Sequence, residues 1–298
     1  MQRTSRRCFL VSMLASSTCG CAHWLPARKE PEPSKPTILS QDVARDTVGI
    51  ETILLRLSSV ESQQMQELWA YADEQIISPE QRLLLDRNGL RAGKFAGQLP
   101  AITQAWISQN ADRIQKDPME QAGVVADVSN FSQLWRCRPD QRKVLTVRNL
   151  SKETVTLFYN EEGFRGGQFP APHFLFSLYA KPQGPRSAQV LIRPELEYGQ
   201  SRRSVVAKDS AIRTEERRES IVWDSLAMVV QMQQGDCLIV TGSPEPRGIG
   251  EHFFRTRSKE GEVQDVILLV RVAELNAPDE FAEAQSMPTQ KNTQALKR

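Results

Sequence analysis

Short apolar runs separated by turn residues fill residues 141–275, and this pattern limits the fold of the chain more than any other feature. Turn sequences such as Gln183-Gly184-Pro185 and Gln234-Gly235-Asp236 divide the runs. Strand-length runs at this spacing are typical of antiparallel β structure. We therefore predict a β-rich sandwich or open-barrel domain with strands at 143–148, 154–159, 173–180, 187–198, 203–208, 220–232, 236–241 and 264–273.

Two of these runs allow more specific predictions. Apolar and polar residues alternate in much of 187–198, which indicates a strand with one face in water. Glu195 and Glu197 fall on the face that we expect to be wet. Residues 264–273 form the most apolar run, so we expect that strand at the centre of a sheet.

Residues 46–115 mix helix and strand signals. An apolar, β-branched run indicates a strand covered on both faces, and Ser58 with Glu61 has the spacing of a capping box at a helix start. The expected elements are a strand at 48–57, a helix after Ser58, a helix from Ser78 to Asn88, a strand at 90–95 and a helix at 100–110. The order β-α-α-β-α predicts a small layered α/β module, with Trp69, Phe95 and Trp106 in its core.

The predicted fold class is therefore α+β, with the small module at 46–115 followed by the β-rich domain at 141–275. A connector at 116–140 joins the two. Three further segments are expected outside the folded body: a signal peptide at 1–21, a Pro-rich tether at 22–45 and a disordered tail at 276–298.

The N-terminus carries an export signal. The sequence Ser5-Arg6-Arg7-Cys8-Phe9-Leu10 resembles the twin-arginine consensus, with Val11 in place of the final Lys. The apolar run that follows, at 8–15, is too short to span a bilayer, which takes ~20 apolar residues. It has the length and flanking residues of a cleavable signal, so Arg6 and Arg7 are the predicted export residues.

The end of this signal resembles a lipobox. In Thr18-Cys19-Gly20-Cys21 the glycine and the second cysteine match the pattern, so we predict a lipid on Cys21. Cleavage by ordinary signal peptidase, with Cys21 incidental, is the alternative. Ala22 rather than Asp follows Cys21, which implies a lipid anchor at the periplasmic face of the outer membrane.

The charge balance excludes one class of partner. Once Arg3, Arg6 and Arg7 are set aside, 35 basic residues face 36 acidic ones, and the basic clusters are interleaved with acids. A nearly neutral body lacks the basic surface that binds nucleic acid. We therefore expect a membrane, through the lipid, and another envelope protein as partners, and no nucleic acid.

Reactive residues do not form a recognisable catalytic set. His173 and His252 lie outside metal-binding spacings, and the mature chain has no Cys-x-x-Cys, so we predict no metal, cofactor or catalytic residue. Ser225 after Asp224, with His252 elsewhere, gives only a weak hydrolase pattern. Cys137 and Cys237 are expected to be separate buried thiols, with a disulfide between them as the alternative.

Two resemblances carry functional implications. Three segments, 190–196, 234–242 and 264–272, resemble the core of the secretin homology domain of outer-membrane secretion channels. The chain also resembles uncharacterised exported lipoproteins of planctomycete-type bacteria, through Asn88-Gly89-Leu90-Arg91-Ala92-Gly93 and Gly250-Glu251-His252-Phe253-Phe254. This second resemblance implies a location in the cell envelope.

Three functional hypotheses follow from these observations. The first is a non-enzymatic envelope lipoprotein that acts as a binding or structural component. The second is an envelope hydrolase whose site uses His173 or His252; it requires one imidazole in a cavity, within hydrogen-bond reach of a Ser, Asp or Glu. The third is a secretin-like component of a secretion machine, which predicts ring-shaped oligomers.

Overall fold

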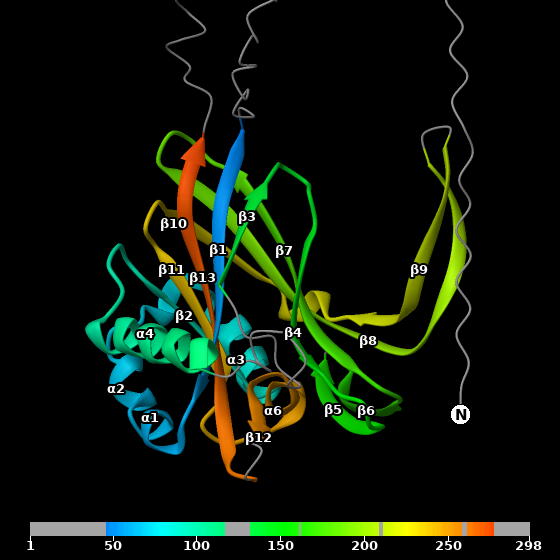
Figure 1. Ribbon diagram of the computed structural model, residues 1–298, viewed down its shortest axis with the longest axis horizontal. Helices are drawn as coiled ribbons and strands as arrows, with labels where there is room; N and C mark the ends of the chain where they lie inside the picture. Colours follow the sequence, from blue (N-terminus) through cyan, green and yellow to red (C-terminus); the bar gives the residue numbers. More distant parts are fainter. Residues whose placement is uncertain (1–45, 117–131, 161, 209–210, 258–260, 277–298) are drawn as a thin grey trace, which may run out of the picture. The chain divides into compact units, whose positions relative to one another are not determined.

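A computed structural model describes residues 46–116, 132–160, 162–208, 211–257 and 261–276, all within one compact unit (Figure 1). The first half holds β1 (Thr47–Leu57), α1 (Ser59–Gln63), α2 (Met65–Trp69), η1 (Glu74–Ile76), α3 (Pro79–Arg87), β2 (Leu90–Phe95), α4 (Ala101–Lys116), β3 (Ser132–Cys137) and β4 (Lys143–Asn149). The second holds β5 (Thr154–Asn160), β6 (Gly163–Phe169), β7 (His173–Pro182), β8 (Ser187–Lys208), β9 (Ala211–Val222), η2 (Asp224–Leu226), β10 (Met228–Gln233), β11 (Cys237–Gly242), α6 (Gly248–Phe254), β12 (Arg255–Arg257) and β13 (Val263–Asn276). The fold is α+β, with antiparallel sheets.

Two sheets form the framework of the described residues. The first has the order β2-β11-β13-β1-β3, with β12 also paired to β13. The second has the order β10-β8-β7-β4, with β9 paired to β8. β5 and β6 form a separate two-stranded hairpin.

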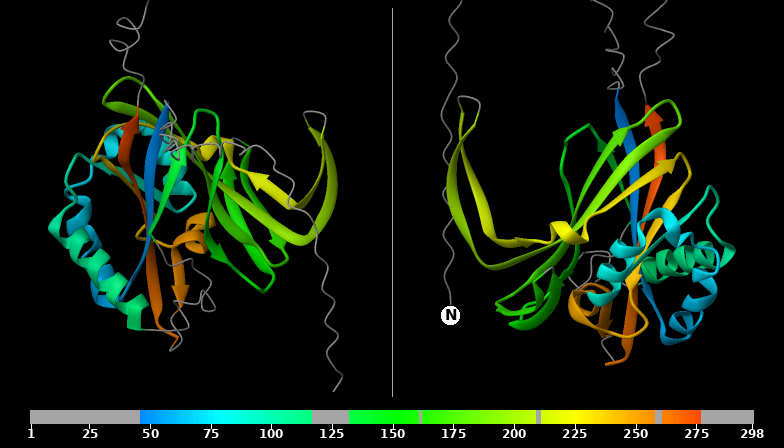
Figure 2. Two further views of the ribbon diagram at one scale, coloured as in Figure 1. Left: turned by 45° about the horizontal axis from the view of Figure 1, so that its top comes forward. Right: turned by 180° about the vertical axis from the view of Figure 1, so that it is seen from behind.

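The first sheet is buried on both faces because its strands are apolar at consecutive positions. On β13, Leu268 and Val270 belong to the large core cluster that also contains the inward side chains of the second sheet. Ile267 and Leu269 belong to a smaller cluster with Trp69 and Trp106 of the helices. The helices α1, α2 and α4 therefore cover one face of this sheet and the second sheet lies against the other (Figure 2).

Several local predictions are confirmed. Ser58 and Glu61 form the expected capping box, and Ser78 accepts a hydrogen bond from the Gln81 backbone N–H at the start of α3. The strand at 90–95 is β2. β13 lies between β11 and β1, inside the first sheet, as its apolar sequence predicted.

The predicted boundary between an α/β module and a β-rich domain does not separate two folding units. The elements at 46–115 occur in the expected order, except that the helix predicted after Ser58 is divided into α1, α2 and the 3-10 helix η1. Their strands belong to the common sheet, where β1 pairs with β13 and β2 with β11. β3, inside the predicted connector at 116–140, also pairs with β1. Completing this sheet requires strands from both ends of the described chain.

The β-rich part differs from its prediction in how the runs divide. The runs at 187–198 and 203–208 are one strand, β8, and the run at 220–232 contains the end of β9, the turn η2 and β10. β6 and β9 were not predicted, because their sequences, rich in glycine or charge, lack an apolar pattern. Gly248 and Gly250, which are typical turn residues, lie instead at the start of the helix α6.

Glu195 is not on a wet face. Its side chain is only 2% exposed, although it lies on the face of β8 turned away from the main core. Arg142 and Arg193 both pair with it, and Arg193 also binds Asp224 at 2.6 Å. Glu197, two residues further along β8, is half-buried. The prediction for Glu195 was wrong because side chains from neighbouring segments cover this part of the strand.

The export and anchoring residues lie outside the described part of the chain. Arg6, Arg7 and Cys21 fall within 1–45, and the predicted tail falls almost wholly within 277–298. Those assignments remain predictions from the sequence. In the ranges that the structure describes, no helix has both the length and the apolar character needed to cross a membrane.

Candidate functional site

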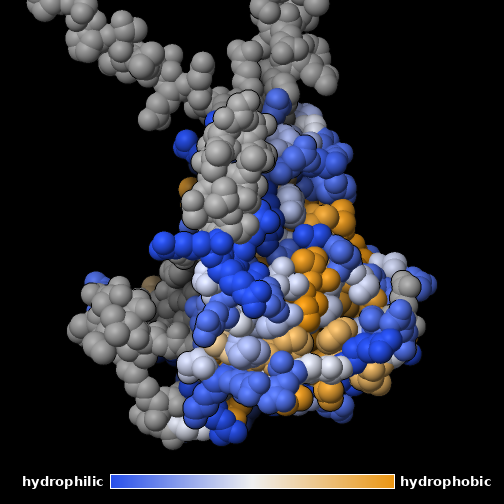
Figure 3. Space-filling model, turned by 90° about the vertical axis from the view of Figure 1, so that its right-hand side faces the viewer, coloured by the Kyte–Doolittle hydropathy of each residue, from blue (hydrophilic) through white to orange (hydrophobic). Residues whose placement is uncertain are grey.

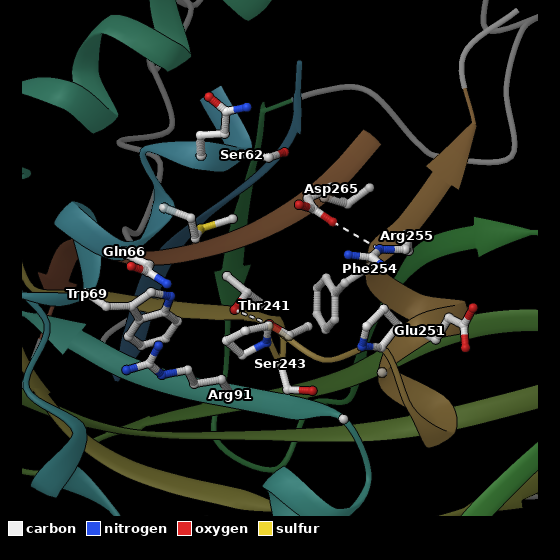
Figure 4. A pocket seen from close by; sticks show the side chains of 18 residues that line it. Ser62, Gln66, Trp69, Arg91, Thr241, Ser243, Glu251, Phe254, Arg255 and Asp265 are labelled. Atoms are coloured by element: carbon white, nitrogen blue, oxygen red, sulfur yellow. Dashed lines mark hydrogen bonds and ion pairs between the residues drawn. The ribbon is translucent and has the colours of Figure 1, made fainter. Parts of the chain in front are cut away.

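A cavity of about 460 Å³ opens between the α1–α2 pair and α6 (Figure 4). Its wall combines the ends of β2 and β11, part of β13 and the loop that joins β11 to α6. Met65, Trp69, Phe254 and Val266 supply apolar surface, and the polar lining comes from Ser62, Gln66, Arg91, Thr241, Ser243, Glu251, Arg255 and Asp265. The volume falls within the range of small-molecule sites.

One wall of the cavity is a close crossing of two main-chain segments. Gly89 has a φ of +73°, and the backbone N–H of Gly250 donates to the Asn88 carbonyl at 2.9 Å. A Cβ atom on Gly250 would lie 1.7 Å from the Gly89 oxygen. Only glycine fits at this crossing, because any side chain there would meet backbone rather than a movable neighbour.

The side chain of Asn88 helps to hold these two segments in place. This side chain is fully buried, donates to the carbonyls of Leu84 and Tyr159, and accepts from the Tyr159 backbone N–H at 2.8 Å. The segments 88–93 and 250–254, which carry the resemblance to exported lipoproteins, are thus in direct contact. The contact accounts for the glycines at positions 89 and 250, whatever the cavity binds.

The charges of the cavity are largely neutralised within the fold. The Arg91 guanidinium lies 4.0 Å from the centre of the Trp69 ring and pairs with Glu74 at 2.5 Å. Arg255 pairs with Asp265 at 3.3 Å. Each pair leaves some hydrogen-bonding capacity free, so the cavity offers polar contacts without a strong net charge.

Two hydroxyl groups of the cavity are arranged as acceptors. Thr241 Oγ1 donates to the Gly242 carbonyl at 2.9 Å and Ser243 Oγ to the Glu245 carbonyl at 2.6 Å. Their protons are therefore committed, and their lone pairs remain for a ligand donor. Ser62 Oγ is buried and has no hydrogen-bond partner within the described residues. A ligand with both donors and apolar surface fits this lining.

Neither predicted histidine lines this cavity. His252 lies on α6 with its ring stacked on Phe174, 5.4 Å between ring centres. Burial lowers its pKa, with nearby Glu251 acting against the shift and Arg148 adding to it. Burial, then the charge of Arg218, lowers the pKa of His173.

The proposed hydrolase trio is not brought together either. Asp224 binds Arg193. The Ser225 carbonyl accepts from Gln81. In the described ranges, neither His173 nor His252 hydrogen-bonds a Ser, Asp or Glu side chain.

The two cysteines of the body lie on opposite faces of the first sheet. Cys137 belongs to the core between the sheets, and Cys237 to the core under the helices, so the expectation of separate buried thiols is confirmed. Burial raises the pKa of Cys137 to about 11 and that of Cys237 to about 12. Both thiols are protonated at neutral pH and shielded, which makes them poor nucleophiles.

Comparison with protein-family models, curated proteins and solved structures finds no match. Within the part of the chain that the structure describes, no group of three or more His, Cys, Asp or Glu side chains is placed to hold a metal ion. Of the segments that resemble a secretin domain, β11 and β13 are neighbours in the first sheet, whereas β8 lies in the second.

Sequence analysis did not identify the cavity. Its charged residues come from opposite ends of the described chain: Arg91 lies on β2, whereas Glu251, Arg255 and Asp265 lie on α6, β12 and β13. The segments 88–93 and 250–254, noted in the sequence for their resemblance to exported lipoproteins, both line the cavity, but neither pattern indicated that the two segments meet.

Proposed function

We propose that this protein is a non-enzymatic lipoprotein of the cell envelope that binds a small ligand, or a side chain of another envelope protein, in the cavity between α2 and α6. The cavity carries the binding part of the proposal. Its size, apolar walls and spare acceptors suit recognition. Among the described residues that line it, no Ser or Thr hydroxyl is hydrogen-bonded to a His, Asp or Glu side chain that could activate it. The export motif and Cys21 support the location, on the outer membrane because Ala22 follows the cysteine.

The anchor is tested by changing the residues that define it. Wild-type protein should carry a fatty acid and fractionate with membranes, whereas Cys21→Ser should be exported without lipid and be released in soluble form. Arg6→Lys with Arg7→Lys should keep the chain in the cytosol, since paired guanidiniums are what the export receptor reads. Metabolic labelling with a fatty acid and cell fractionation measure both outcomes. A mature chain that begins at Met1 contradicts the proposal.

Binding in the cavity is tested by photo-crosslinking in intact cells. A photoreactive amino acid at Gln66, on the cavity rim, should give a discrete adduct. The same group at Gln75, on η1 outside the cavity, should not. Asp265→Asn should weaken the Gln66 adduct several-fold, because it removes the negative charge and one acceptor oxygen and weakens the pairing with Arg255. Equal adducts from both positions would show that the cavity is not the binding site.

The size of the mature protein in solution separates this proposal from the secretin-like alternative. A monomer or small oligomer agrees with a binding protein. A large ring that resists dissociation would favour a secretion-channel component instead.

A further inference from the structure

The β5–β6 hairpin exposes large apolar side chains on one face. Val155 is 64% exposed, Leu157 55% and Phe164 73%. Figure 3, which views the molecule from the side on which the hairpin lies, shows apolar residues among hydrophilic ones on this face. Clustered exposure of this kind marks interaction sites, whereas isolated exposed apolar residues do not.

The register of the hairpin explains why these residues gather. Leu157 pairs with Gly166 and Tyr159 with Phe164, so alternate residues of β5 share a face with Phe164. The opposite face is turned to the body, where Thr156 is buried and Phe158 contacts the Trp223 ring at 5.8 Å. The hairpin is therefore fixed by one face and leaves the other apolar and open.

The open face is also pre-ordered. Leu157 lies across Gly166, where a Cβ atom would come within 2.7 Å of Leu157 Cδ2. Phe164 packs edge-to-face on Tyr159, with ring centres 5.1 Å apart, and Arg87 donates to the Tyr159 hydroxyl at 2.7 Å. Side chains already held in place lose little conformational entropy when they bind.

The size and charge of the face indicate what it contacts. Three side chains fall well short of the ~800 Å² per partner that a stable protein dimer buries. The basic groups near this face do not form a cluster: Arg165, on the opposite face of β6, pairs with Glu162 at 2.6 Å, and Arg87 lies 4.7 Å from the centre of the Tyr159 ring. A bilayer interface needs only local insertion of apolar groups and suits a small apolar patch beside an arginine.

We infer that the outer face of the β5–β6 hairpin contacts the membrane, with Val155, Leu157 and Phe164 entering its interfacial layer. This inference rests on the proposed lipid anchor. The segment 22–45 spans at most about 85 Å when fully extended, which keeps the body close to the bilayer. Tethering gives the folded body a high effective concentration at the membrane surface. A membrane contact that is too weak to bind the untethered protein can then be occupied much of the time.

The test supplies the anchor artificially, so it does not depend on lipid at Cys21. The mature chain from residue 22, with a histidine tag in place of the lipid, is tethered to phosphatidylethanolamine–phosphatidylglycerol vesicles that contain a nickel-chelating lipid. An environment-sensitive dye is placed on Phe164→Cys or, as the control, on Val60→Cys. Val60 on α1 is similarly exposed, at 63%, and lies away from the hairpin. The buried native thiols should not take up the dye.

We expect a blue shift and about a twofold rise in emission at position 164 on tethering, since an interfacial group sits ~5–10 Å into the headgroup boundary. Position 60 should not change. Adding Val155→Ser and Leu157→Ser to the labelled Phe164→Cys chain should abolish most of the rise while leaving the melting temperature unchanged, because both side chains are exposed. No change at 164, equal changes at 164 and 60, or a change that follows protein concentration without vesicles would overturn the inference.

Discussion

Gly250→Ala should prevent folding or lower the free energy of unfolding by more than ~4 kcal/mol. The added Cβ would lie 1.7 Å from the Gly89 oxygen and 2.2 Å from its carbonyl carbon. That carbonyl already accepts from the Ser243 backbone N–H at 2.8 Å, so it is fixed from the other side. No side-chain rotation relieves a main-chain collision, and the two segments must separate. Urea unfolding, or the yield of folded protein, measures the loss.

Gly97→Ala is the matched control for that substitution. Gly97 has a φ of +68°, and a Cβ atom added to it would meet no other atom of the described residues within 4 Å. Its substitution should cost only the backbone strain of a left-handed residue, about 1–2 kcal/mol. If Gly250→Ala and Gly97→Ala lower the free energy of unfolding by similar amounts, the two segments can separate at little cost. The crossing would then not hold the cavity wall in place.

The elements that were predicted correctly are those fixed by neighbouring residues. Ser58 with Glu61 defines a helix start within four residues, and the run at 90–95 defines a strand by its own composition. β9 shows the limit of this approach. Its charged sequence, 211–222, has no apolar alternation, and it is a strand because β8 runs beside it. Strand pairing is a tertiary property that sequence propensity reports only weakly.

The same limit explains why the candidate site was missed. In the sequence, Arg91 looks like an ordinary charged residue on a short strand. Only the folded structure shows that it lies over Trp69 and beside Glu74. Conversely, the export motif depends on a short contiguous sequence, so it is visible without a structure. Local motifs therefore support a prediction of the protein's location, which stays a prediction, whereas a cavity assembled from the separate stretches 62–69, 89–91 and 241–266 could not be predicted.

Removing both arginines around Glu195 should destabilise the protein by about 3–5 kcal/mol, because a buried charge is left without an ion-pair partner. Arg142→Leu with Arg193→Leu leaves a carboxylate that is 2% exposed without either ion-pair partner. Arg165→Leu is the control, since its pair with Glu162 is exposed and worth ~1 kcal/mol or less. Denaturant unfolding at pH 7 compares the variants. A double variant no weaker than the control would contradict burial of this charge.

Adding Glu195→Leu to the double variant should restore most of the lost stability, because an uncharged apolar trio replaces a buried ion-pair network at little net cost. If the triple variant is as unstable as the double variant, lost packing of the two arginine side chains, rather than the charge of Glu195, accounts for the deficit.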